Sequence, residues 1–243
     1  MISQDQTQTA PAANNLKTAG ARGLPLNVFW IYVVAFFAVW SVRALIVIRI
    51  DDSIQSPLGK NVFSNTVKFV IWVLPVFVTL AICRLRPFDY LKLSTPVNKR
   101  GLLPAMVVIT VWLSLAIIGE SIISGKSIGA ILSQRSADWL SILAGVAVSP
   151  IWEEILFRGF FLNRLNESLS FWVANVISAL LFVAVHMPYW VSRNGFSPGV
   201  TKNLVNVFLL GCVFGWIMKQ TNSLWPAIGA HIANNFVSVL IHG

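Results

Sequence analysis

Residues 150–158 read PIWEEILFR, which sets two adjacent carboxylates and an arginine inside a long apolar run. The run starts near Leu140 and continues through GFFL at 159–162. If the run forms a membrane helix, these charges lie in or near hydrocarbon, where each is costly unless it is paired or hydrated. The alternative is a buried helix of a soluble protein with an ordinary surface patch. The composition decides between the two interpretations.

The composition is that of a membrane protein. Of the 243 residues, 56% are hydrophobic and only 11% are charged, whereas a soluble domain carries about 25% charged residues. The predicted fold is therefore all-α, a polytopic bundle of about seven or eight transmembrane helices with any site inside the bundle. Cys83 and Cys212 lie in apolar runs without spaced partners, which favours packing roles over a disulfide or zinc framework.

The formal net charge of +9 does not indicate nucleic acid. The basic residues are spread over short loops rather than gathered on one face, and positive loops suit the cytoplasmic side of a membrane. The expected partners are the lipid bilayer and a membrane-associated protein or peptide. The distribution of Lys and Arg over the loops favours a cytoplasmic N-terminus, and we expect the plasma membrane of a bacterium.

Apolar runs divide the chain into spans. A polar tail at 1–22 is expected to be disordered, N-terminal membrane helices occupy 23–139, and residues 140–243 hold the remaining spans. The fourth span exceeds the roughly 20 residues that a bilayer needs, so we expect it to be tilted or kinked at Pro150. Pro188 is expected to end the fifth span, and Lys68 to snorkel from near the start of the second. The seven spans cover approximately 24–42, 62–83, 102–119, 140–165, 169–187, 203–218 and 224–241.

Helical spacing separates the three charges of the opening stretch. Arg158 lies four residues beyond Glu154 and faces it, so it can neutralise that carboxylate. Glu153 points about 100° away and is left unpaired, which would make it take up a proton more readily and suit it to general acid or base catalysis. Alternatively, both glutamates lie at the membrane interface and end the helix.

Two histidines inside later spans are at a compatible depth. If the turns at 166–168 and 220–223 share one membrane face, Glu153 lies about 18–20 Å from it, His186 about 24–27 Å and His231 about 12–14 Å, at 1.5 Å per residue. Tilt absorbs differences of several ångströms, so the three groups can meet near mid-membrane. His231 and Asn235 share one helical face. Each histidine also has a simpler interpretation, His186 as an interface residue and His231 as half of a packing pair.

Three motifs on successive spans together resemble a known family. Glu-Glu-x-x-x-Arg at 153–158, Phe-x-x-x-His at 182–186 and His-x-x-x-Asn at 231–235 occur in the order seen in the CAAX prenyl protease and bacteriocin-processing (CPBP, or Abi) family of intramembrane endopeptidases. The resemblance covers about residues 140–243, which would form the catalytic core. The first 130 or so residues match only as membrane spans.

The resemblance implies a role for each motif residue. Glu153 with His186 would activate the attacking water, while His231 and Asn235 would stabilise the oxyanion. Glu154 would belong to the catalytic set with Arg158 as its support, and Phe182 would pack beside the site. HIANN at 231–235 also offers Asn234, but the family spacing favours Asn235.

The metal question stays open at the level of sequence. Glu153, His186 and His231 are a plausible set for zinc or another divalent ion with an open position for water. No His-Glu-x-x-His helix is present. Metal-free activation of water by Glu153 and His186 is equally compatible with the motifs.

Two other functions are compatible with the same spans. A non-catalytic protein of the same fold could act in bacteriocin self-immunity, although the intact motif set argues mildly against it. A proton-coupled transporter could use Glu153 as its carrier, although the chain is short and has no inverted repeat. The leading hypothesis is an intramembrane endopeptidase that cleaves a membrane-associated protein of CAAX or bacteriocin-related type.

Overall fold

The computed structural model describes residues 23–47, 50, 53–132 and 143–242, and their regular structure is entirely helical. The tail predicted at 1–22 and the first residues of the fourth predicted span lie outside the described residues. The elements in chain order are α1 (Leu26–Val42), η2 (Arg43–Val47), α3 (Pro57–Lys68), η3 (Phe69–Val73), α4 (Leu74–Ile82), α5 (Pro87–Tyr90), α6 (Lys99–Ser124), α7 (Ile128–Leu132), η4 (Ala144–Val148), α9 (Ser149–Glu154), η5 (Ile155–Leu162), α10 (Asn163–Asn166), α11 (Phe171–Asn194), α12 (Pro198–Thr221) and α13 (Trp225–His242).

Several of these helices are membrane spans by length and composition. Among the described residues, 5 helices are long and apolar enough to cross a bilayer: Leu26–Ile46, Pro57–Ile82, Lys99–Ser124, Phe171–Asn194 and Pro198–Thr221. The fourth and seventh predicted spans are also helical, as the continuous run 144–166 and as α13. They are not among the helices that satisfy both the length and the apolar composition of a membrane span. The prediction of an all-α, polytopic bundle is confirmed.

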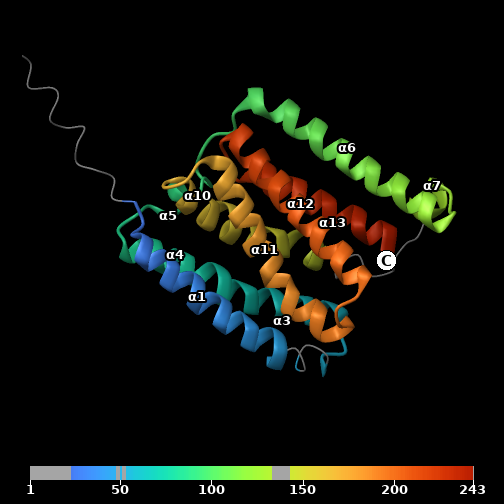
Figure 1. The fold of residues 1–243 in the computed structure, drawn as a ribbon, viewed down its shortest axis with the longest axis horizontal. Coiled ribbons are helices and arrows are strands. Elements are labelled where there is room, and N and C mark those ends of the chain that lie inside the picture. Colours follow the sequence, from blue (N-terminus) through green and yellow to red (C-terminus); the bar gives the residue numbers. More distant parts are fainter. Residues whose placement is uncertain (1–22, 48–49, 51–52, 133–142, 243) are drawn as a thin grey trace, which may run out of the picture.

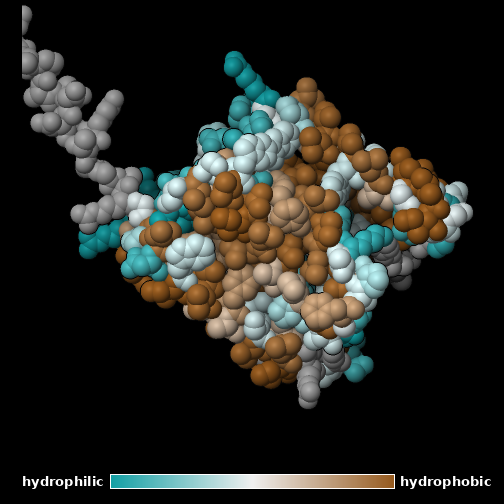
Figure 2. All heavy atoms as spheres, in the orientation of Figure 1, coloured by the Kyte–Doolittle hydropathy of each residue, from teal (hydrophilic) through white to brown (hydrophobic). Residues whose placement is uncertain are grey.

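The surface of the bundle is that of a protein in lipid. Large apolar side chains are exposed along the outer helices, including Ile31 and Val34 on α1 and Leu103 and Ile122 on α6. Hydrophobic residues cover much of the face in Figure 2. Figure 1 shows α1 and α4 on one side of the bundle and α6 on the other, with α11 and α12 between them. The site helix 144–166 contacts helices from both halves of the chain.

An aromatic core joins α1, η3 and η5. Phe29, Trp72, Phe157, Phe160 and Phe161 are fully buried and stack edge to face with their neighbours. Such pairs stabilise a core beyond the area they bury. This core fixes the helix that carries the two glutamates against the N-terminal helices, which places the second span beside the site.

Two expectations about individual spans are wrong. Pro188 does not end the fifth span, because α11 continues through it to Asn194. Proline removes one backbone hydrogen bond, but the helix continues past it, and Tyr189 and Trp190 in the next turn line a cavity with His186. Lys68 does not lie near the start of the second span, because that helix begins at Pro57. At 1.5 Å per residue, Lys68 is about 16 Å along it.

Candidate active site

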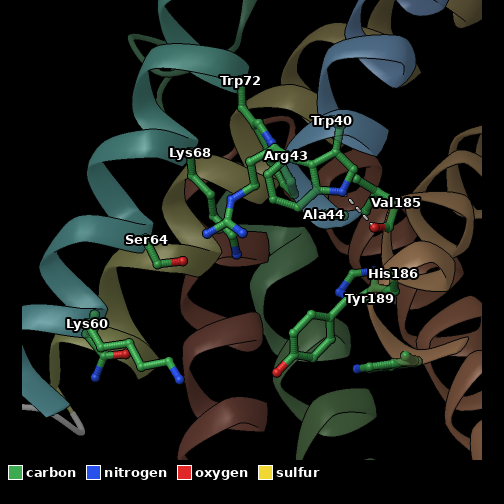
Figure 3. Close-up of a pocket in the computed structure, with 12 residues that line it drawn as sticks. Trp40, Arg43, Ala44, Lys60, Ser64, Lys68, Trp72, Val185, His186 and Tyr189 are labelled. Carbon is green, nitrogen blue, oxygen red and sulfur yellow. Dashed lines mark hydrogen bonds between the residues drawn. The ribbon is translucent and has the colours of Figure 1, made fainter. Parts of the chain in front are cut away.

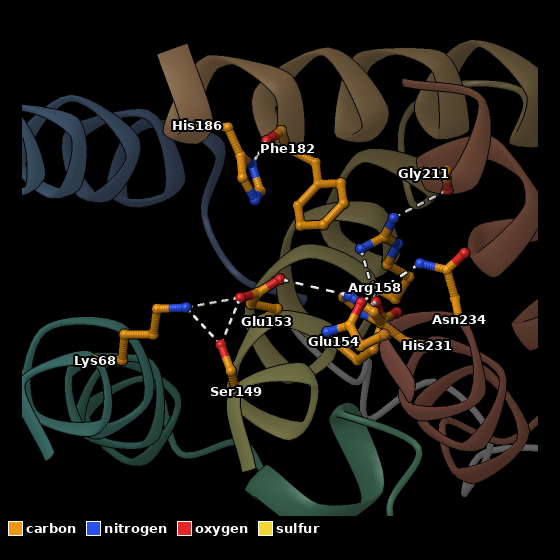
Figure 4. A network of polar contacts seen from close by, with 11 residues as sticks. Lys68, Ser149, Glu153, Glu154, Arg158, Phe182, His186, Gly211, His231 and Asn234 are labelled. Atoms are coloured by element: carbon orange, nitrogen blue, oxygen red, sulfur yellow. Dashed lines mark hydrogen bonds and ion pairs between the residues drawn. The ribbon is translucent and has the colours of Figure 1, made fainter. Parts of the chain in front are cut away.

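Glu154 is the centre of a buried polar network. Its Oε1 atom accepts a hydrogen bond from Arg158 Nη1 at 2.9 Å and contacts His231 Nδ1 at 2.8 Å. Glu154 is 0% exposed and Arg158 1%. The pairing of Glu154 with Arg158 expected from their spacing is present. Arg158 also donates to the carbonyl oxygen of Gly211 at 3.1 Å, so the network joins the site helix to α12 and α13 (Figure 4).

Glu153 is not the unpaired acid that helical spacing predicts. Lys68 Nζ lies 2.7 Å from Glu153 Oε1, and Ser149 Oγ donates to the same oxygen at 2.7 Å. The Lys68 ammonium also donates to Ser149 Oγ, which closes a triangle of three polar groups. The prediction failed because Lys68 lies 85 residues away in sequence on another helix, and periodicity within one helix cannot show such a partner.

His231 contacts both glutamates. Its Nδ1 atom meets Glu154 Oε1, and its Nε2 atom lies 3.7 Å from Glu153 Oε2. A carboxylate is an acceptor, so Nδ1 carries the proton and donates to Glu154, which turns Nε2 toward Glu153. The ring stacks on Phe214, 4.7 Å between centroids. Depth along the spans allows Glu153, His186 and His231 to meet inside the bundle, and this contact brings Glu153 and His231 together.

His186 lies on the far side of Phe182 from His231. Phe182 stands edge-on to both rings, with centroids 4.9 Å from His186 and 5.9 Å from His231. His186 Nδ1 is 2.7 Å from the carbonyl oxygen of Phe182. A carbonyl only accepts, so Nδ1 holds the proton, and in the neutral ring Nε2 is left as a lone-pair base. The Arg158 guanidinium lies over the face of the Phe182 ring, with its Cζ atom 4.4 Å from the ring centroid.

Asn235 lies one turn after His231 on α13 and is half-buried. Asn234 Nδ2 donates to Asn235 Oδ1 at 3.4 Å, a contact that uses the amide oxygen of Asn235 and not its nitrogen. Among the contacts of the described residues, none joins Asn235 to Glu153 or to either histidine. Its expected role at an oxyanion therefore stays a prediction.

A cavity of about 290 Å³ adjoins the cluster. Lys68 and Ser64 face it from α3, and His186 and Tyr189 face it from α11, as Figure 3 shows. Trp40 forms part of the wall and donates to the carbonyl oxygen of Val185 at 2.8 Å. Lys68 and His186 thus belong both to the cavity wall and to the surroundings of Glu153.

Glu153, His186 and His231, the possible metal ligands, are not grouped as a metal site among the described residues. Among the described residues, no three His, Cys, Asp or Glu side chains are grouped so as to hold an ion. Glu153 Oε1 is occupied by the Lys68 ammonium, and the carboxylates of Glu153 and Glu154 are balanced by Lys68 and Arg158. A divalent ion would meet two fixed cations beside its carboxylate ligand. The donor set does not fit zinc.

Fold and site define an integral membrane protein that holds two carboxylates and a histidine in one buried cluster. Residues 135–237 match the family described as "Type II CAAX prenyl endopeptidase Rce1-like". This part of the chain is therefore similar to that family of endopeptidases, and it contains the three motifs at 153–158, 182–186 and 231–235.

One curated relative carries a functional name. The chain is 31% identical over 112 residues to the protein described as "Putative membrane peptidase YdiL" from Bacillus subtilis (strain 168). The match spans 46% of this chain and 41% of the relative, so less than half of each protein is compared. No solved structure matches the chain.

Sequence reasoning missed three residues of the site. The sequence suggests only an interface position for Lys68, and it indicates no role for Ser149 or Phe214. Lys68 could have been found, since a lysine in an apolar span is costly enough to suggest a buried acidic partner. Ser149 precedes Glu153 by four residues, the spacing of neighbours on one helical face. Phe214 carries no signal, because an aromatic residue in a membrane helix is ordinary.

Proposed function

We propose that the protein is an intramembrane endopeptidase in which Glu153 and His186 activate a water molecule. His231 and Asn235 are proposed to stabilise the oxyanion, with Glu154 and Arg158 supporting His231. The observation that carries the proposal is the position of His231, whose two ring nitrogens face the two glutamates inside an apolar bundle. A carboxylate and imidazoles held together away from bulk water are the groups that general acid–base hydrolysis requires.

The proposed reaction is hydrolysis of one peptide bond. Glu153 Oε2 accepts a proton as the water oxygen attacks the carbonyl carbon, since Oε1 is already bonded to Lys68 and Ser149. The carbonyl oxygen takes the negative charge and is stabilised by donors from α13, the Asn235 amide and a His231 ring that carries a proton on Nε2 as well as on Nδ1. The C–N bond then breaks, and the proton passes to the departing amine nitrogen. The products are a new carboxyl terminus and a new amino terminus.

The proposed substrate is a membrane-associated protein or peptide, which reaches the cluster through the cavity shared by Lys68 and His186. Irregular peptide backbone can be accommodated at membrane depth where it lies inside protein. Prenylated CAAX-type chains and bacteriocin precursors are the two classes that we propose to test first. A cytoplasmic N-terminus in a bacterial plasma membrane remains the orientation expected from the basic loops.

The proposal is tested by comparing membrane peptides from cells that make the active chain with those from cells that make Glu153→Ala or His231→Ala. We expect specific cleavage products with the unaltered chain and a loss of at least about 100-fold in both variants, because each removes a group that takes part in proton transfer or charge stabilisation. Quantitative mass spectrometry of new peptide termini measures the result.

Glu120→Gln is the matched control. It removes a carboxylate from α6, away from the cluster, and cleavage should match that of the unaltered chain. Retained cleavage in both site variants would contradict the proposal. A cellular effect that persists in Glu153→Ala without cleavage would instead favour a non-catalytic role.

A further inference from the structure

Lys68 belongs to the N-terminal helices, outside the residues that match the endopeptidase family, yet it bonds directly to Glu153. We infer that Lys68 is a positioning residue that holds the Glu153 carboxylate ionised and directs its Oε2 atom toward the attacking water. The inference rests on the proposed function for its catalytic consequence. The active site is then built by both halves of the chain.

The contacts at Glu153 are asymmetric. Oε1 is bonded to the Lys68 ammonium and to the Ser149 hydroxyl, each at 2.7 Å. Oε2 lies 3.7 Å from His231 Nε2, which is longer than a hydrogen bond, and among the described residues it has no side-chain donor comparable to those on Oε1. Two donors on one oxygen fix the rotation of the carboxylate. The lone pairs of Oε2 are therefore the ones that can take a proton from water.

The position of Lys68 is itself determined by packing. Asn65, one turn earlier on α3, donates to the carbonyl oxygen of Ala144 at 3.1 Å and so ties this helix to the start of the site helix. The Lys68 ammonium lies 5.1 Å from the centre of the Trp72 ring. The Lys68 side chain is 17% exposed, toward the cavity, and that of Glu153 is 7% exposed. An ion pair enclosed in this way is only weakly screened.

The other charged and titratable groups around Glu153 do not replace Lys68. Arg158 is bonded to Glu154, and His231 donates to Glu154 through Nδ1. His186, on α11, donates to a backbone carbonyl. Within the described residues, Lys68 is the cation in hydrogen-bonding contact with Glu153. Without it, the carboxylate would lie buried with a neutral hydroxyl as its donor, a state that favours protonation.

The first test measures ionisation and needs no substrate. Dicyclohexylcarbodiimide reacts with protonated carboxyl groups in membranes, and mass spectrometry of the peptide that contains Glu153 reports its labelling. We expect low labelling in the unaltered protein and in Lys68→Arg, and a severalfold rise in Lys68→Met. Lys202→Met, which removes an exposed lysine on α12, is the matched control and should stay low. Equal labelling of Lys68→Met and the unaltered protein would overturn the inference.

The second test measures turnover on the cleaved peptide. Lys68→Met should lower kcat by about 100-fold, the loss typical of a misplaced catalytic group, with KM nearly unchanged. Lys68→Arg should recover about a tenth or more of the activity, because its guanidinium keeps the charge and the donors. A kcat for Lys68→Met equal to that of the unaltered protein, while Glu153→Ala is inactive, would overturn the inference and leave the endopeptidase proposal standing.

Ser149→Ala distinguishes positioning from nucleophilic catalysis. Lys68 still reaches Glu153 directly in this variant, so we expect a loss of kcat of no more than about tenfold. A loss as large as that of Glu153→Ala would make Ser149 a nucleophile paired with Lys68 and overturn the positioning role. If the unaltered protein shows no Glu153-dependent cleavage, the endopeptidase proposal fails, and the labelling test alone decides whether Lys68 holds Glu153 ionised.

Discussion

Glu154 binds its partners through one oxygen. Oε1 accepts hydrogen bonds from both Arg158 and His231, while Oε2 is buried without a hydrogen-bond partner among the described residues. A buried acceptor left in this way costs free energy, and the guanidinium beside it offsets the charge. The same guanidinium lies over Phe182 and donates to Gly211. Arg158 therefore holds three helices around the carboxylate.

Removing one member of this pair should be worse than removing both charges. Arg158→Met leaves Glu154 buried without its main counter-charge, and we expect a loss of about 3–5 kcal/mol in the free energy of unfolding. The double variant Arg158→Met/Glu154→Gln has no uncompensated charge and should be more stable than Arg158→Met. Thermal unfolding of the protein in detergent measures both. A double variant less stable than the single one would show that the pair does not act by charge compensation.

The contact between Glu153 and Lys68 joins two separate helices, so spacing within one helix cannot predict it. The spacing of Glu154 and Arg158 is local, so the sequence predicts their contact. Lys68 and Glu153 meet only because the aromatic core brings the second span against the site helix. A lysine and a glutamate far apart in sequence carry no signal of contact. The apolar surroundings of both residues indicate only that each needs a partner.

At the scale of elements, small residues decide where helices approach closely. Gly101, at the start of α6, lies against the backbone at the end of α12, and a Cβ atom there would stand 1.9 Å from the carbonyl oxygen of Gln220. The two helix ends are joined by a bond from Asn98 N to the carbonyl oxygen of Thr221 at 2.7 Å. Backbone cannot move aside as a flexible side chain can, so glycine is required at this crossing.

Alanine at this crossing should destabilise the protein. Gly101→Ala forces α6 away from α12, at a cost of about 1–3 kcal/mol for an overpacked contact. Gly119→Ala is the matched control on the same helix, since a Cβ atom there has open space around it. Replacing a helical glycine by alanine should stabilise by up to about 1 kcal/mol. Equal melting temperatures for the two variants would contradict the close approach of α6 and α12.

At the scale of the whole molecule, the cavity connects the N-terminal helices to the cluster. Its wall includes Trp40 and Ser64 from the first two spans and His186 from α11. The family match begins at residue 135, so part of this wall comes from helices that the match does not cover. Residues 140–243 as the catalytic core remain a proposal, and Lys68 and the cavity wall indicate that the core needs the helices before it.

Filling the cavity should hinder substrate access without disturbing the cluster. Ser64→Phe places an aromatic ring in a space of about 290 Å³, and we expect KM for the cleaved peptide to rise by about tenfold or more, equivalent to ~1.4 kcal/mol of binding. Val62→Phe is the control, because Val62 is 54% exposed on the outside of the same helix. Its KM should stay unchanged. A normal KM in Ser64→Phe would place the access route elsewhere.

The sequence by itself determined the class of fold, the order of the helices and three motifs, because apolar runs and spacing within a helix are local properties. The pairing of Glu154 with Arg158 follows from that spacing, and depth along the spans allows Glu153 and His231 to meet. The tertiary structure alone decided that Lys68 pairs with Glu153, that Ser149 completes the triangle and that the metal ligands are not grouped. Those contacts depend on which faces of separate helices pack together, and that choice is made by the shape of the whole aromatic core.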